Sequence, residues 1–131
     1  MYYPEDQILD QPERFVVAEI IREKILLKTN EEVPHSVAVV IESFKESRKT
    51  KGLIEINAVI VVERPSQKKI IIGSGGSKIK DIGKNARLDI AKFLGNKIYL
   101  ELFVKVIPKW RDREKFLNEI GFKEFNFEND V

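Results

Sequence analysis

The chain contains no cysteine and only one histidine, His35, among its 131 residues. Without thiols it can form neither a disulfide nor a thiolate metal site, and one imidazole completes neither a His/Cys nucleophile pair nor a zinc cluster. A structural or capping role is favoured for His35, which follows Pro34 at the expected entrance of a strand. No apolar run approaches the ~18 residues of a membrane span. The first residues have neither the basic nor the apolar region of a signal peptide. A cytoplasmic location is consistent with these absences.

Three nucleotide-binding motifs are also missing or incomplete. No G-x-x-x-x-G-K-[ST] loop occurs, and residues 96–99 begin like the N-K-x-D guanine box but carry Tyr99 in place of Asp. The glycines that begin at Gly73 do not complete a G-x-G-x-x-G motif, because position 78 is Lys78. We therefore expect no enzymatic activity from this chain alone.

Hydrophobic residues make up 43% of the chain and charged residues 34%, which is typical of a globular domain. The net charge of +2 is small, but the basic residues concentrate between positions 66 and 97, where only Asp81 and Asp89 oppose them. The first 32 and the last 20 residues lean acidic. A basic centre between acidic flanks indicates a polyanion site. Lysines that merely solvate a helix would give the same charge pattern.

Hydrophobic periodicity divides the chain into alternating helical and extended segments. Apolar residues recur at helical spacing in the first segment, while the segment from position 53 alternates as a strand does. A charged turn ending in Gly52 separates the first two strands and predicts a hairpin. The expected helices cover residues 12–28, 67–72, 77–94 and 112–120, and the expected strands cover residues 36–44, 53–63 and 97–107.

This order predicts an α+β fold, in which a three-stranded sheet carries its helices on one face. In the long helix at residues 77–94, we expect the buried side to carry Ile79, Ile82, Ala86, Ile90 and Phe93. In the last strand, the even-numbered positions 98–106 are apolar and should face the core.

A glycine cluster, Gly73-Ser74-Gly75-Gly76, joins two expected helices. Glycine has no Cβ, so a sugar–phosphate strand can lie against the main chain there, and the free N–H groups at the start of the next helix favour phosphate. Along that helix Lys80, Lys84 and Arg87 follow one another on one side, with Lys78 in the first turn. The alternative is an ordinary helix–turn–helix connection in which Gly73 is a C-cap. Trp110 and Arg111 could stack on a base, but for Trp110 packing on the core is favoured.

The residues around the cluster resemble a known signature. The string IIIGSGGSKIKDIG at residues 70–83 is similar to the KH-domain motif (V/I)-I-G-x-x-G-x-x-I. The element order resembles the type II KH fold, α-β-β-α-α-β with a short C-terminal helix, and further segments resemble the C-terminal KH domain of the bacterial GTPase Era family. Those segments are YPEDQI (3–8), ERF (13–15), AEIIREK (18–24), EEVPHS (31–36), VER (62–64), SQK (66–68), YLEL (99–102) and VKV (104–106).

The resemblance implies an RNA-binding module that recognises the single-stranded 3′ end of small-subunit ribosomal RNA during assembly of the 30S-type subunit. It implies RNA contacts from the loop, from the start of the helix and from an apolar floor. The implied contact residues are Gly73, Ser74, Gly75, Gly76, Ser77, Lys78, Ile71, Ile72 and Ile79. The helical spacing of Lys80, Lys84 and Arg87 adds these three cations to the expected RNA-binding residues. Two positions depart from the family: Ser74 stands where a Lys is common, and Phe103 stands where a Trp is frequent.

The same resemblance divides the chain into a segment at residues 1–11 that follows a G domain absent here, a KH domain at 12–122 and a polar tail at 123–131. GTP and magnesium would belong to the absent domain, and this chain would hold no cofactor or metal. We expect a cytoplasmic monomer, with peripheral membrane contact as a property of the longer protein. Two alternatives stay open: a type II KH domain for other RNA or single-stranded DNA, and a protein-interaction module that uses the basic face.

Overall fold

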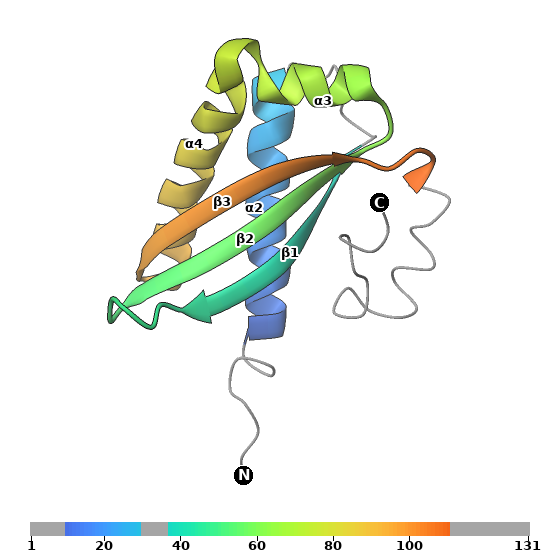
Figure 1. Ribbon diagram of the computed structural model, residues 1–131. Helices are drawn as coiled ribbons and strands as arrows, with labels where there is room; N and C mark the ends of the chain where they lie inside the picture. The colour runs from blue at the N-terminus through green and yellow to red at the C-terminus, as the bar shows by residue number, and fades with distance from the viewer. Residues whose placement is uncertain (1–9, 30–36, 111–131) are drawn as a thin grey trace.

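The computed structural model describes residues 10–29 and 37–110, and Figure 1 labels its helices and strands. The expected helix at 112–120 and the tail at 123–131 lie outside the described residues. In chain order the elements are α2 (Asp10–Thr29), β1 (Val37–Glu46), β2 (Leu53–Val62), α3 (Pro65–Ile72), the short 3-10 helix η1 (Ser74–Gly76), α4 (Ser77–Leu94) and β3 (Lys97–Val106).

The sheet has the strand order β1-β2-β3, with an antiparallel β1–β2 pair and a parallel β2–β3 pair. Strands β1 and β2 form the predicted hairpin, and the register shifts between Ile41 and Ser43. A parallel pair needs a crossover connection, which α3, η1 and α4 supply. The mixed sheet with its helices is therefore an α+β fold in the order α-β-β-α-α-β, as predicted.

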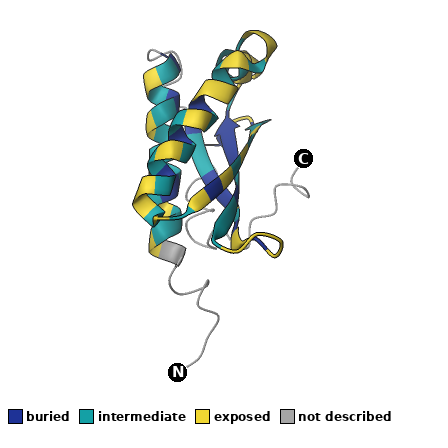
Figure 2. Cartoon of the chain, turned by 90° about the vertical axis from the view of Figure 1, so that its left-hand side faces the viewer, coloured by how far each residue is buried: buried dark blue, intermediate teal, exposed yellow. Residues whose placement is uncertain are grey.

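The main core lies between one face of the sheet and the helices α2 and α4, which Figure 1 shows behind the sheet and Figure 2 shows from the side. Alternate residues of β2 and β3 face this core, as their period of two predicts. The helices bury residues at helical spacing. The fully buried members are Val17, Ile21, Ile25, Ile56, Ala58, Ile60, Val62, Ile71, Ile82, Ala86 and Ile90.

One core prediction is wrong. Phe93 was expected on the buried side of α4, but its side chain is 47% exposed. It lies one turn beyond Ile90, the last residue of α4 that the core covers completely. Periodicity along a helix gives the direction of a side chain and does not show where the covering layer ends.

A second, smaller cluster lies on the opposite face of the sheet. Val40, Val59 and Val61 pack there with Ile107 and Trp110, whose side chain is only 6% exposed. Trp110 is therefore a packing residue, and its ring is not presented to solvent for base stacking.

The start of α3 shows why the observed helix begins earlier than predicted. The Gln67 side-chain oxygen accepts hydrogen bonds from the N–H groups of Glu63 and Arg64, both at 3.0 Å. Pro65 occupies the first turn, where its missing N–H costs nothing. Together these residues start α3 at Pro65, two residues before the predicted position.

Candidate nucleic-acid interface

The binding loop, Gly73–Gly76, connects α3 to α4 and begins with a glycine that cannot be replaced without movement. Gly73 has φ 75° and ψ 175°, a conformation essentially restricted to glycine. A Cβ at this position would lie 2.7 Å from Lys78 Cβ and 2.9 Å from the Lys78 backbone nitrogen. Gly73 also ends α3, because its N–H donates to Lys69 O at 2.9 Å. The residue is thus a C-cap, as the simpler interpretation held, and in addition a point of close approach to α4.

The remainder of the loop presents its main chain to solvent. Gly75 and Gly76 have φ 62° and 79°, and a Cβ at either position would meet nothing within 4 Å. Ser74, Gly75 and Ser77 are exposed. Gly76 is the N-cap of α4, so no side chain caps the first N–H groups of that helix. The N-terminal end of the α4 dipole, which is positive, therefore lies beside loop backbone that no side chain covers. This arrangement favours the binding of a phosphate group.

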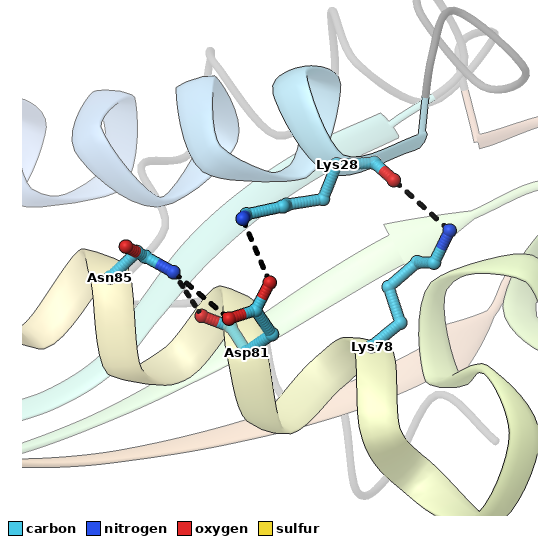
Figure 3. A network of polar contacts seen from close by, with 4 residues as sticks. All are labelled: Lys28, Lys78, Asp81 and Asn85. Carbon is cyan, nitrogen blue, oxygen red and sulfur yellow. Dashed lines mark hydrogen bonds and ion pairs between the residues drawn. The ribbon is translucent and has the colours of Figure 1, made fainter.

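The side chain of Lys78 extends toward α2, and its expected contact with RNA stays a prediction. Its ammonium donates a 3.0 Å hydrogen bond to the backbone oxygen of Lys28, at the C-terminal end of α2 (Figure 3). A cation is stabilised there by the last carbonyls of a helix. Lys78 thus joins the first turn of α4 to α2, and its contribution to the interface in this conformation is positional.

In a polar network next to Lys78, the carboxylate of Asp81 is paired with a cation of α2. The Lys28 ammonium lies 2.8 Å from Asp81 Oδ2, and the Asn85 amide donates to Asp81 O and Oδ1 at 2.8 and 3.2 Å (Figure 3). The hydrogen bond from Lys28 lowers the pKa of Asp81 below its ordinary value. At neutral pH the Asp81 carboxylate is therefore charged and paired with the Lys28 ammonium.

The second acid of α4, Asp89, is also paired with a cation of α2. It forms an ion pair with Lys24 of α2. The hydrogen bond between the Lys24 ammonium and the Asp89 carboxylate lowers the pKa of Asp89 and raises the pKa of Lys24. Asp81 and Asp89 are the only acids of α4, and both bind cations of α2.

The basic stripe, Lys80, Lys84 and Arg87, lies on another side of α4. Lys80 and Lys84 are exposed and Arg87 is half-buried, close to Ile98 at the start of β3. Their spacing of four and three residues keeps them in one row, as predicted. At its Arg87 end the stripe borders the start of β3. The charge of Lys84 also contributes to the lowered pKa of Asp81.

The expected apolar floor is only partly at the surface. Ile72 and Ile79 are half-buried and keep an exposed portion beside the loop. Ile71 is 0% exposed and belongs to the main core. In this structure Ile71 supports the floor from beneath, and its contribution to ligand binding stays a prediction.

Sequence reasoning missed Gly83 and Leu102, which bring α4 and β3 close together beside this floor. A Cβ built on Gly83 would lie 3.6 Å from Leu102 Cδ1, an ordinary van der Waals contact. The only signal was a glycine in the interior of a helical pattern, a position that costs helix stability unless packing compensates.

Other expected features fall outside the interface. His35 lies in the part of the chain that the structure does not describe. Within residues 10–29 and 37–110, no three His, Cys, Asp or Glu side chains gather as metal ligands would. Among the helices of those same ranges, none combines the length and apolar character needed to cross a bilayer.

Comparison with known sequences matches the chain to one protein family. A sequence model of the KH domain matches residues 32–111. Proteins named GTPase Era from Leuconostoc citreum and Carboxydothermus hydrogenoformans are each 53% identical to this chain, over 126 and 124 residues. These alignments cover 96% and 95% of this chain and 41% of each relative, so the chain spans about two fifths of the length of the curated relatives it matches.

The solved structures that resemble this chain are also structures of Era. Era from Aquifex aeolicus, a point variant bound to GDP and AlF4⁻, superposes with a TM-score of 0.78 and 44% identity over 92% of this chain and 40% of that one. A structure of Era in complex with MgGDPNP and nucleotides 1506–1542 of 16S ribosomal RNA has a TM-score of 0.78 and 43% identity. That match covers 93% of this chain and 40% of the solved chain.

Proposed function

This chain belongs to the KH domain family, and we propose that it binds single-stranded RNA across the binding loop, Gly73–Gly76. The observation that carries the proposal is the bare loop backbone at the uncapped start of α4, in a chain 43% identical to an Era crystallised with 16S ribosomal RNA. KH domains clamp about four nucleotides of backbone with a GxxG loop. The loop here has that pattern, and its three glycines all have positive φ angles.

Each part of the interface has a distinct task in this proposal. The loop backbone and the start of α4 receive a phosphate, and the basic stripe binds the phosphates that follow. Exposed portions of Ile72 and Ile79 provide an apolar surface for sugars or bases. Lys78 and Gly73 fix the position of α4 relative to α2 and the loop.

The relatives suggest the setting. We assign the RNA to the 3′ end of small-subunit ribosomal RNA and the process to assembly of the small ribosomal subunit in the cytoplasm. Binding of GTP and magnesium is assigned to other parts of a longer protein, so this segment would bind RNA without catalysis. Residues 1–11 would connect to those parts, and any contact with a membrane surface would belong to the longer protein.

A comparison of RNA with DNA tests the proposed function. The chain should bind a single-stranded RNA from the 3′ end of 16S ribosomal RNA more tightly than DNA of the same sequence. We expect a ratio of about 3- to 10-fold, the value of one net hydrogen bond to a 2′-OH. Fluorescence anisotropy with both labelled oligonucleotides measures it. Equal binding would favour a single-stranded DNA module, and salt-independent or absent binding would favour a protein-interaction domain.

Neutralising the basic stripe should weaken binding to all RNA sequences alike. The stripe should contact phosphates, which position the strand without reading bases. In the variant Lys80→Gln/Lys84→Gln/Arg87→Gln, each lost contact should flatten the slope of log affinity against log salt by roughly 0.7. Lys92→Gln is the control, because Lys92 is an exposed cation of α4 whose charge acts on Asp89, on the α2 side. A slope unchanged from wild type would mean that the stripe is only a solvated face.

A further inference from the structure

A second group of cations lies at the end of the domain opposite the binding loop. The basic turn, Arg48, Lys49 and Lys51, is part of the connection between β1 and β2, and all three side chains are exposed. Figure 1 shows this connection and the end of α4 at the same end of the molecule, with the α3–α4 connection at the other. The proposed function assigns no task to these cations.

Hydrogen bonds hold the turn in one conformation without using the cationic side chains. Ser47 is buried, and its hydroxyl accepts hydrogen bonds from the N–H groups of Lys49 and Thr50, both at 3.1 Å. The Ser47 N–H donates to Leu53 O at 2.8 Å. The Gly52 N–H donates to the Glu46 carboxylate at 3.3 Å. The three charges are thus presented on an ordered backbone, which lowers the entropic cost of binding.

The turn is joined to the end of the basic stripe. The Asn96 amide donates to Gly52 O at 3.2 Å, which ties the turn to the connection between α4 and β3. Beside this bond is an open depression of about 480 Å³ that includes the cations Arg87 and Lys97. Its remaining lining residues are Leu53, Ala91, Gly95, Asn96 and Ile98. A row of positive charge therefore continues from the loop, along α4, into the depression and onto the turn.

Neighbouring acids do not interrupt this row. Asp81 and Asp89 face α2, where they bind Lys28 and Lys24. The carboxylate of Glu46, the last residue of β1, accepts the Gly52 N–H. Within the described part of the chain, no ion pair involves the basic stripe, the basic turn or Lys97. These cations are available to an external polyanion.

We propose that the basic turn and Lys97 bind the phosphate backbone of the same RNA, several nucleotides from the segment held by the binding loop. The inference rests on the proposed function and extends it to a longer footprint. Helix α4 has 18 residues and is about 27 Å long at 1.5 Å per residue. At about 3.4 Å per nucleotide of a stacked strand, that distance corresponds to about eight nucleotides. An RNA that fills only the loop cannot reach the turn.

RNA length separates the two contacts experimentally. The probes are labelled RNAs of about five and about sixteen nucleotides that share one sequence at the loop-binding end. Wild type should bind the longer RNA more tightly and with a steeper salt dependence. The variant Arg48→Gln/Lys49→Gln/Lys51→Gln should lose about tenfold in affinity for the longer RNA at low salt. The slope of its log affinity against log salt should flatten by about 2, because three phosphate contacts are lost and each contributes roughly 0.7.

The short RNA is the internal control for folding and for the proposed function. Its affinity should be the same for wild type and variant, because it does not reach the turn. If the short RNA binds normally and the variant binds the long RNA like wild type, the second contact does not exist, and the turn faces another partner such as an acidic protein. If neither RNA binds to wild type, the proposed function itself fails. A Lys92→Gln variant that lost as much affinity for the long RNA would also overturn the proposal, by showing an effect of net charge alone.

Discussion

Placing two carboxylates on the binding loop, in the variant Ser74→Asp/Gly75→Asp, should abolish RNA binding while the domain stays folded. Both residues are exposed, and the loop backbone is the expected site of a phosphate. The new charges would repel that phosphate and remove charge-assisted hydrogen bonds worth about 1.5–3 kcal/mol each. We expect affinity to fall by at least about a hundredfold. Titration with one labelled RNA, together with thermal unfolding of the variant, measures both parts of the prediction.

The matched control is Ser74→Asn/Gly75→Asn, which has nearly the same shape and no charge. Gly75 has φ 62° and ψ 19°, a left-handed conformation that Asn and Asp tolerate better than most residues. The backbone strain is therefore shared by both variants, and only the charge differs. The Asn variant should keep most of its affinity. A folded Asp variant with wild-type affinity would falsify the assignment of the loop.

Replacing Gly73 by alanine should cost about 2–4 kcal/mol of unfolding free energy and should also impair RNA binding. The conformation of Gly73 lies in a region where other residues carry about 1–3 kcal/mol of strain. In addition, the new Cβ would lie 2.7 and 2.9 Å from Lys78 Cβ and N, so the first turn of α4 would have to move. That movement displaces the phosphate-facing end of the helix. Urea denaturation gives the stability change, and RNA titration below the unfolding range gives the change in affinity.

Gly95→Ala separates backbone strain from collision. Gly95 has φ 72°, and a Cβ there would meet nothing within 4 Å. An alanine at this position should cost only about 1 kcal/mol, the penalty of a left-handed conformation. It should leave the affinity for a short RNA unchanged. If Gly73→Ala were no more destabilising than Gly95→Ala, the close approach of Lys78 would have no energetic consequence.

The fold was largely predictable because two periodicities stand out. Positions alternate in β3 and in the first half of β2, and the apolar stripes of α2 and α4 recur at helical spacing, so most of the core face follows directly. The binding loop was predictable because glycines at both ends of a four-residue connection between helices restrict the backbone. The parallel pairing of β2 with β3 was not specified, since strand order depends on how the crossover packs.

The direction of individual side chains was harder to predict. Lys78 is next to the loop in sequence, yet it binds the carbonyl of Lys28, 50 residues earlier in the chain. Ile70, Ile71 and Ile72 are identical neighbours, and only the packing of α3 decides that Ile71 alone is buried. The bond between Asn96 and Gly52 likewise joins residues 44 positions apart. These features arise from tertiary contacts that no local pattern encodes.

The crossover between β2 and β3 has a consequence for folding. Residues 63–96 carry the binding loop and the basic stripe, and they lie between two strands that pair in parallel. The β1–β2 hairpin is a local structure that can form early, whereas the β2–β3 ladder forms only after this long segment closes, at an entropic cost. We therefore expect the binding loop and the basic stripe to reach their fixed positions late in folding, when β3 docks. A nascent chain that has not yet released β3 from the ribosome would present the loop residues without their fixed geometry.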